Sequence, residues 1–103
     1  MRGTMIVIQP SGEITKRTYI NREIPLADLN KAVGGYIEHV PLFDTYEGKD
    51  CIVFCNEYGK IQNLPYNKPA TDLWRQVSMQ EIPDHLVGSI AIITGDREFM
   101  DNL

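Results

Sequence analysis

The amino-acid sequence predicts a small α+β domain, with a mostly antiparallel, partly mixed sheet of about five to six strands and two short helices. Three observations favour this class. Short runs rich in β-branched and aromatic residues recur between Gly, Pro and Asn turn signals. Residues 24–33 have the apolar spacing of a helix. Residues 86–94 are almost entirely apolar, which is typical of a strand buried on both faces.

The first two strands are predicted to form a hairpin. Residues 5–9 are a short apolar run, and residues 10–12 (Pro-Ser-Gly) are a turn signal. Residues 13–20 alternate in polarity without a continuous apolar face. We therefore expect the second strand to be half exposed or to lie at an edge of the sheet.

The helix predicted for residues 24–33 has clear start and stop signals. Pro25 fits the first helical position, where its missing N–H has no intrahelical partner. Gly34 follows the last apolar residue and can adopt the left-handed conformation that ends a helix. The apolar residues of its packing stripe are Leu26, Leu29 and Val33.

The middle of the chain predicts two further strands and a second hairpin. The strands are residues 36–42 and 51–55, separated by a polar loop over residues 43–50. The turn signal at residues 56–60 leads into Ile61, so we expect a short hairpin partner after it.

A second, shorter helix is expected over residues 69–76, with Asn67 or Thr71 as its cap. Its packing face comprises Leu73, Trp74 and Val77. Residues 78–85 are predicted to be a loop, and the apolar run 86–94 the last and central strand.

Length and composition indicate one domain over residues 1–103. We expect an ordered core over about residues 5–95 and a polar tail over residues 96–103, either frayed or one helical turn. Apolar residues make up 43% of the chain, which argues against disorder. The net charge of −4 argues against a general phosphate-binding surface, so no direct nucleic-acid contact is expected. No stretch resembles a signal peptide or membrane span, so we expect a soluble, cytoplasmic protein without membrane contact.

The two cysteines predict neither a disulfide nor a metal site. On one strand the Cα atoms of Cys51 and Cys55 would lie about 13 Å apart, beyond the ~7 Å that a bridge allows. His39 and His85 are isolated from them in sequence, so no zinc-ligand spacing exists. No nucleophile elbow, P-loop or dinucleotide fingerprint occurs either. We therefore expect no metal, no cofactor, no catalytic residues and no enzymatic activity.

The turn at residues 56–60 and the nearby residues 66 and 67 have the strongest ligand-binding character. They provide amide, carboxylate and ammonium groups for a polar ligand, and tyrosines that could stack on a base. The candidate ligand- or partner-binding residues are Asn56, Glu57, Tyr58, Lys60, Tyr66 and Asn67. Turn chemistry offers a structural alternative, because Asn and Gly are common in hairpin turns and Asn67 could simply cap a helix.

Four segments in this order resemble a known family. They are Gly-Gly-Tyr-Ile-Glu-His-Val-Pro-Leu at 34–42, Cys-Asn-Glu-Tyr-Gly-Lys at 55–60, Leu-Pro-Tyr-Asn at 64–67, and Val-Gly at 87–88 before the strand that ends in Thr-Gly. Over about residues 5–95 the chain resembles a family of small domains of unknown function found in phages, mobile elements and bacteria. The resemblance implies a fold and a genomic neighbourhood, with the host cytoplasm as location if the protein is phage-encoded. It implies no catalytic residues.

The expected function is therefore that of a non-enzymatic binding domain that acts on a host or element-encoded protein. Tyrosine-bearing loops and an exposed strand edge would form its interface. A small-ligand or nucleotide-like binder is one alternative. Another is a mildly acidic nucleic-acid mimic that inhibits a host defence enzyme, since acidic residues gather at 44–50 and 96–101. The sequence leaves the target and the oligomeric state open.

Overall fold

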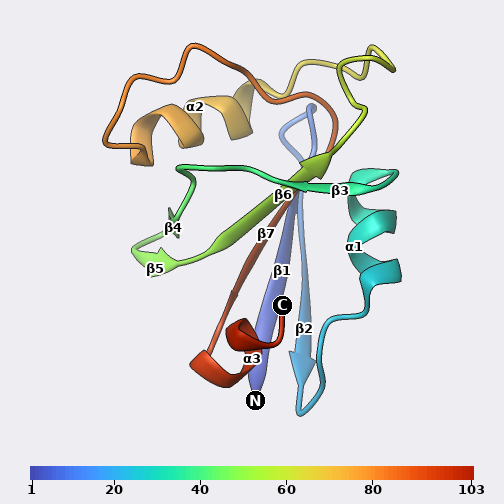
Figure 1. Cartoon of the computed structure of the whole chain (residues 1–103), viewed down its shortest axis with the longest axis vertical. Helices are drawn as coiled ribbons and strands as arrows, with labels where there is room; N and C mark the ends of the chain where they lie inside the picture. Colours follow the sequence, from blue (N-terminus) through green and yellow to red (C-terminus); the bar gives the residue numbers. More distant parts are fainter.

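The computed structural model describes all of residues 1–103 and contains one five-stranded sheet with helices on both faces (Figure 1). The strand order is β2-β1-β7-β6-β3, and every neighbouring pair is antiparallel. The strands are β1 (Arg2–Ile8), β2 (Ile14–Ile20), β3 (Ile37–His39), β6 (Ile52–Asn56) and β7 (Ile90–Gly95).

Three helices and a small hairpin complete the fold. The helices are α1 (Leu26–Val33), α2 (Lys68–Val77) and α3 (Arg97–Asp101). Strands β4 (Thr45–Tyr46) and β5 (Lys49–Asp50) form a separate two-stranded sheet. The N-terminus lies beside the last helix, α3, because its ammonium approaches the carboxylates of Asp96 and Glu98 at 3.8 and 3.7 Å (Figure 1). No helix combines the length and the apolar character that a membrane crossing requires.

The predicted α+β class is confirmed, with three differences in detail. No two neighbouring strands are parallel, so the sheet is antiparallel throughout rather than partly mixed. A third helix is present. Pro25 is the residue before the first helical position of α1 rather than that position itself, whereas Gly34 ends the helix at φ 77° as predicted.

Side chains alternate along the central strands and supply two separate cores. On β7, Ile90 and Ile92 belong to the core beneath α2, while Ala91 and Ile93 belong to the core beneath α1 and α3. This two-sided burial explains the continuous apolar run that predicted a central strand, and β7 is the middle strand of the five. Trp74 of α2 belongs to the first core, as its helical spacing indicated.

The predicted hairpin after β6 is wrong. Residues 57–63 form successive turns with helix-like bonds, such as the Gln62 N–H to the Tyr58 carbonyl at 2.9 Å. The physical reason lies in the sheet: β6 already pairs with β7 on one side and β3 on the other, so it has no free edge for a third partner.

Two predicted polar segments also contribute to the core. Residues 43–50 were expected to be a polar loop, yet Phe43 and Tyr46 are buried beneath the β4–β5 hairpin. Residues 96–103 were expected to be a polar tail, and they form the one-turn alternative, α3, whose Phe99 is 1% exposed. Buried aromatic rings anchor both segments, two in residues 43–50 and one in residues 96–103, because each ring removes a large apolar area from water.

Candidate binding pocket

A pocket of about 230 Å³ lies at the β3–β6 edge of the sheet, on the face that α2 covers. Its walls come from four parts of the chain: β3 and the residues after it, the end of β6 with the following turn, α2, and the irregular segment before β7. The residues around it are Glu38, His39, Val40, Pro41, Cys55, Asn56, Glu57, Lys60, Ile61, Trp74, Asp84, His85, Leu86 and Val87.

The sheet side of the pocket is set by the register of two strands. Glu38 of β3 pairs directly with Cys55 of β6, so their side chains lie on the same face of the sheet. Cys55 packs against the core beneath α2, which places Glu38 on that face as well. Trp74 of α2 also lines the pocket, and its indole N–H donates to the carbonyl of Pro41, another lining residue, at 2.8 Å.

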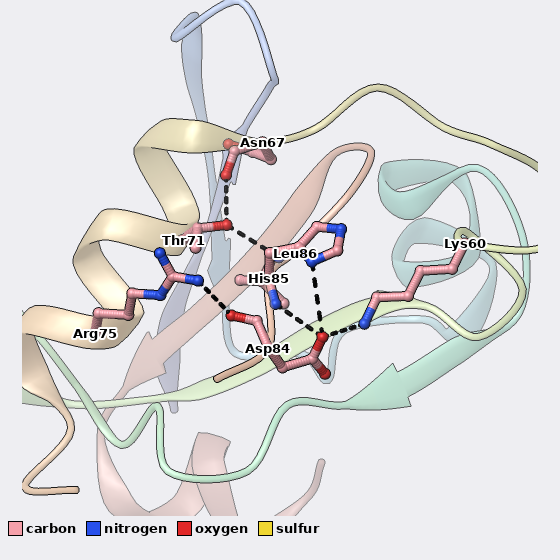
Figure 2. A network of polar contacts seen from close by, with 7 residues as sticks. All are labelled: Lys60, Asn67, Thr71, Arg75, Asp84, His85 and Leu86. Atoms are coloured by element: carbon pink, nitrogen blue, oxygen red, sulfur yellow. Dashed lines mark hydrogen bonds and ion pairs between the residues drawn. The ribbon is translucent and has the colours of Figure 1, made fainter. Parts of the chain in front are cut away.

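Another wall of the pocket is formed by residues 84–86, which hydrogen bonds hold against α2. The Leu86 N–H donates to the Thr71 hydroxyl at 2.9 Å, and that hydroxyl donates to the Asn67 carbonyl at 2.7 Å (Figure 2). One turn further along α2, the Arg75 guanidinium donates to the Asp84 carbonyl at 2.8 Å. These bonds position residues 84–86 without any regular secondary structure.

Asp84 is the centre of charge in this wall. Figure 2 shows the Lys60 ammonium reaching across from the turn after β6 to the Asp84 carboxylate, with which it forms an ion pair. This ion pair, helped by the His85 N–H at 2.8 Å, lowers the pKa of Asp84 below its ordinary range. The His85 ring also contacts Tyr66 edge to face, at 5.6 Å between ring centroids. Lys60 thereby connects two pocket walls that are 24 residues apart in the chain.

The Cys55 thiol lies among these charges and stays protonated at neutral pH. Burial raises its pKa to about 11, and the Glu38 carboxylate acts in the same direction. A protonated thiol is a weak nucleophile, so the pocket presents Cys55 as an apolar contact. Cys51 and Cys55 are both free thiols, and no group of three or more His, Cys, Asp or Glu side chains is arranged to hold a metal ion.

Asn56, a predicted binding residue, acts as a structural link. Its side chain donates to the Val33 carbonyl at the end of α1 and accepts the Tyr58 N–H at 2.9 Å. It is 5% exposed, and a Cβ on Gly35 would come within 2.8 Å of its amide nitrogen. The Gly-Gly pair therefore serves two purposes: Gly34 turns the chain, and Gly35 leaves space for Asn56.

Asn67, another predicted binding residue, is likewise a structural link in this fold. Its side chain donates to the carbonyls of Ile8 and Gly88, at 2.9 and 2.8 Å, and caps α2 by accepting the Ala70 N–H at 3.1 Å. All three bonds are internal and the residue has no exposed surface. The capping role is the alternative that its sequence position offered.

The other predicted residues lie in or beside the pocket. Glu57 and Lys60 line it, Tyr58 is exposed between them on the same turn, and Tyr66 contacts its His85 wall. The structure adds charged residues that were not in the predicted set, Glu38 and Asp84. Their places depend on strand register and on bonds to α2, for which the local sequence carries no signal.

The chain is thus a small α+β domain that has helices on both faces of an antiparallel sheet and a charged pocket at the β3–β6 edge. The family model described as a domain of unknown function (DUF3846) matches residues 1–102. The chain therefore belongs to this family. No curated protein and no solved structure shows significant similarity to the chain.

Proposed function

We propose that the protein is a non-enzymatic binding domain of phage or mobile-element origin, and that the pocket face binds a host or element-encoded protein. The single observation that supports this most is the combination of a preformed pocket with exposed apolar side chains on its rim. Ile61, which lines the pocket, is 80% exposed, and Tyr58 and Tyr66 are 44% and 47% exposed. Exposed apolar and tyrosine side chains around a concave site are characteristic of protein interfaces.

The size of the pocket supports a protein partner over a complete small ligand. Pockets for drug-sized molecules commonly enclose about 300–1,000 Å³. The volume here is about 230 Å³, which suits one inserted side chain, with the rim contacting the surrounding partner surface.

The charge of the pocket weighs against a nucleotide. Glu38, Glu57 and Asp84 contribute carboxylates, and the only ammonium group, that of Lys60, is already paired with Asp84. A phosphate group would meet more negative than positive charge. A small ligand without phosphate remains the second candidate, favoured by the partly enclosed, partly apolar lining that includes Trp74 and Leu86.

Affinity capture with two matched isoleucine variants tests the proposal. Ile61→Ala removes an apolar side chain at the pocket, and Ile20→Ala removes one of 59% exposure on β2, the opposite edge of the sheet. We expect wild type and Ile20→Ala to recover the same discrete protein from a bacterial host lysate. Ile61→Ala should bind it about 10-fold more weakly, as for a residue near the centre of an interface.

Equal recovery by both variants would place the interface elsewhere. If the folded wild-type domain recovers no specific protein from a lysate of any bacterium that hosts the phage or mobile element, the proposal that it binds a protein is contradicted.

A further inference from the structure

We propose that the pocket receives an arginine side chain of the partner protein. This inference rests on the proposed function and specifies the chemistry that the pocket recognises. It combines three features of the pocket: an apolar interior, an excess of carboxylates at its rim, and an internal cation whose side chain is half exposed.

The interior suits the aliphatic part of a long side chain. Leu86 and Trp74 are each 5% exposed, and Cys55 presents an uncharged thiol beside them. The methylene groups of arginine pack well on such apolar surfaces while the charged end stays near water. A short or branched apolar side chain would fill the interior and leave the rim carboxylates unused.

The rim suits the charged end. Three residues with carboxylates, Glu38, Glu57 and Asp84, line the pocket together with a single ammonium-bearing residue, Lys60. Neither Glu38 nor Glu57 forms an ion pair within the chain, so two carboxylates are available to a guest cation. The planar guanidinium, with five N–H donors, can bond to more than one carboxylate at once, which a lysine ammonium does less well.

Lys60 shows that this position takes a cation. Its ammonium forms an ion pair with the Asp84 carboxylate, yet its side chain is 51% exposed and Lys60 lies in a surface turn. Such an exposed pair contributes little to stability, so it can open when a better-placed cation enters. Lys60 therefore acts as an internal competitor, and its removal should increase arginine affinity.

The test is an NMR titration of the full-length protein with N-acetyl-arginine amide and with N-acetyl-citrulline amide. Citrulline keeps the length and shape of arginine and lacks the charge. We expect arginine to shift the amide signals of Cys55, Leu86 and their pocket neighbours, with a Kd of ~1–10 mM. Citrulline should bind at least about 10-fold more weakly, because it cannot pair with the carboxylates.

Two double variants separate pocket charge from overall charge. Each double variant removes two charges from exposed positions: Glu38→Gln/Glu57→Gln in the pocket, and Glu13→Gln/Glu23→Gln at residues that do not line it. We expect the first pair to abolish the preference for arginine over citrulline, the second to preserve it, and Lys60→Ala to strengthen arginine binding several-fold. Equal binding of arginine and citrulline, or no shift at about 50 mM arginine, would overturn the proposal.

Protection of Cys55 gives a second measurement that does not require spectral assignment. Arginine in the pocket should slow alkylation of Cys55 by iodoacetamide, whereas the buried Cys51, which does not line the pocket, should show no arginine-dependent change in the same mass spectrum. If arginine and citrulline protect Cys55 equally, the carboxylates play no part. Because these tests do not use the partner, they can fail while Ile61-dependent capture succeeds, in which case only the arginine assignment falls. If arginine binds as expected and capture fails, the proposed protein partner falls instead.

Discussion

At the scale of single residues, two buried asparagines join segments that are far apart in the chain. Asn56 connects β6 to the end of α1, and Asn67 connects α2 to the end of β1 and to the start of β7. Each side chain has internal partners for its donors and its acceptor. Buried amides of this kind are costly when a partner is lost and are well suited to fixing a unique arrangement.

The variants Asn67→Asp and Asn67→Ala test whether the linking role of Asn67 contributes to stability beyond its cap. Aspartate keeps the oxygen that accepts the Ala70 N–H, but it replaces the amide that donates to Ile8 and Gly88. We expect each variant to lower the free energy of unfolding by about 2–4 kcal/mol, since both leave buried carbonyls without donors. Urea denaturation measures this loss. An Asp variant as stable as wild type would show that only the cap matters.

Tyr19 makes stability sensitive to alkaline pH. Burial and a hydrogen bond to Asp28, 2.8 Å from the Tyr19 hydroxyl, raise the pKa of Tyr19 to about 12. A raised folded-state pKa means that this contribution is complete below pH ~10, the unfolded value, and is lost as the pH rises toward 12. Burial raises the pKa of Cys51 and Cys55 to about 11, which acts in the same direction.

We therefore expect the thermal midpoint to decrease as the pH rises from 9 to 12. The decrease should be smaller in Tyr19→Phe, which has no hydroxyl to ionise. Thermal melts followed by circular dichroism measure this difference. An identical pH dependence in both proteins would exclude Tyr19 as a cause.

At the scale of elements, the short helix α3 is held in place by one ring and one cap. Asp96 accepts the Phe99 N–H at 2.9 Å and, from β1, the Arg2 N–H at 2.8 Å, and these bonds lower its pKa. Phe99 packs against Gly3 and Gly95, where an added Cβ would meet the ring at 2.1 and 2.7 Å. The two glycines on adjacent strands thus form the seat for Phe99.

Phe99→Ala should destabilise the whole domain rather than only free the last residues. Phe99 is 1% exposed and lies 6.2 Å from Tyr19, ring to ring. Truncating such a side chain removes about 3–5 kcal/mol from the free energy of unfolding. The exposed neighbour Arg97 provides the control, since Arg97→Ala should change the value by less than about 0.5 kcal/mol. If Phe99→Ala and Arg97→Ala both change the free energy of unfolding by a similarly small amount in denaturant melts, residues 96–103 are a tail that does not contribute to the core.

At the scale of the whole molecule, the parts of the fold that the sequence predicts are those with local causes. Gly34 ends α1, Asn67 caps α2, and the apolar run of β7 is central because its residues alternate between two cores. The burial of Phe99 and Phe43 could not be predicted, because the few apolar residues in their polar segments lack the periodicity that indicates burial.

The pocket was predictable in part for the same reason. Glu57 and Lys60 belong to one turn, so a local turn signal was sufficient to select them. Glu38 reaches the pocket through the β3–β6 register, and Asp84 through the bonds between its segment and α2. Both placements depend on long-range pairing, which has no local sequence pattern. Conversely, the side chain of Asn67 resembles a ligand-binding group in type, but burial makes it unavailable.

The central claim, that the pocket face binds a protein, is tested most directly by site-specific photo-cross-linking in the host cell. A photoreactive amino acid replaces Ile61 beside the pocket in one version of the protein and Ile20 on β2 in a second. We expect one discrete cross-linked protein from position 61, absent from position 20, and less of it when Glu38→Gln/Glu57→Gln is added. Cross-linking of the same protein from both positions, or from position 20 alone, would contradict it.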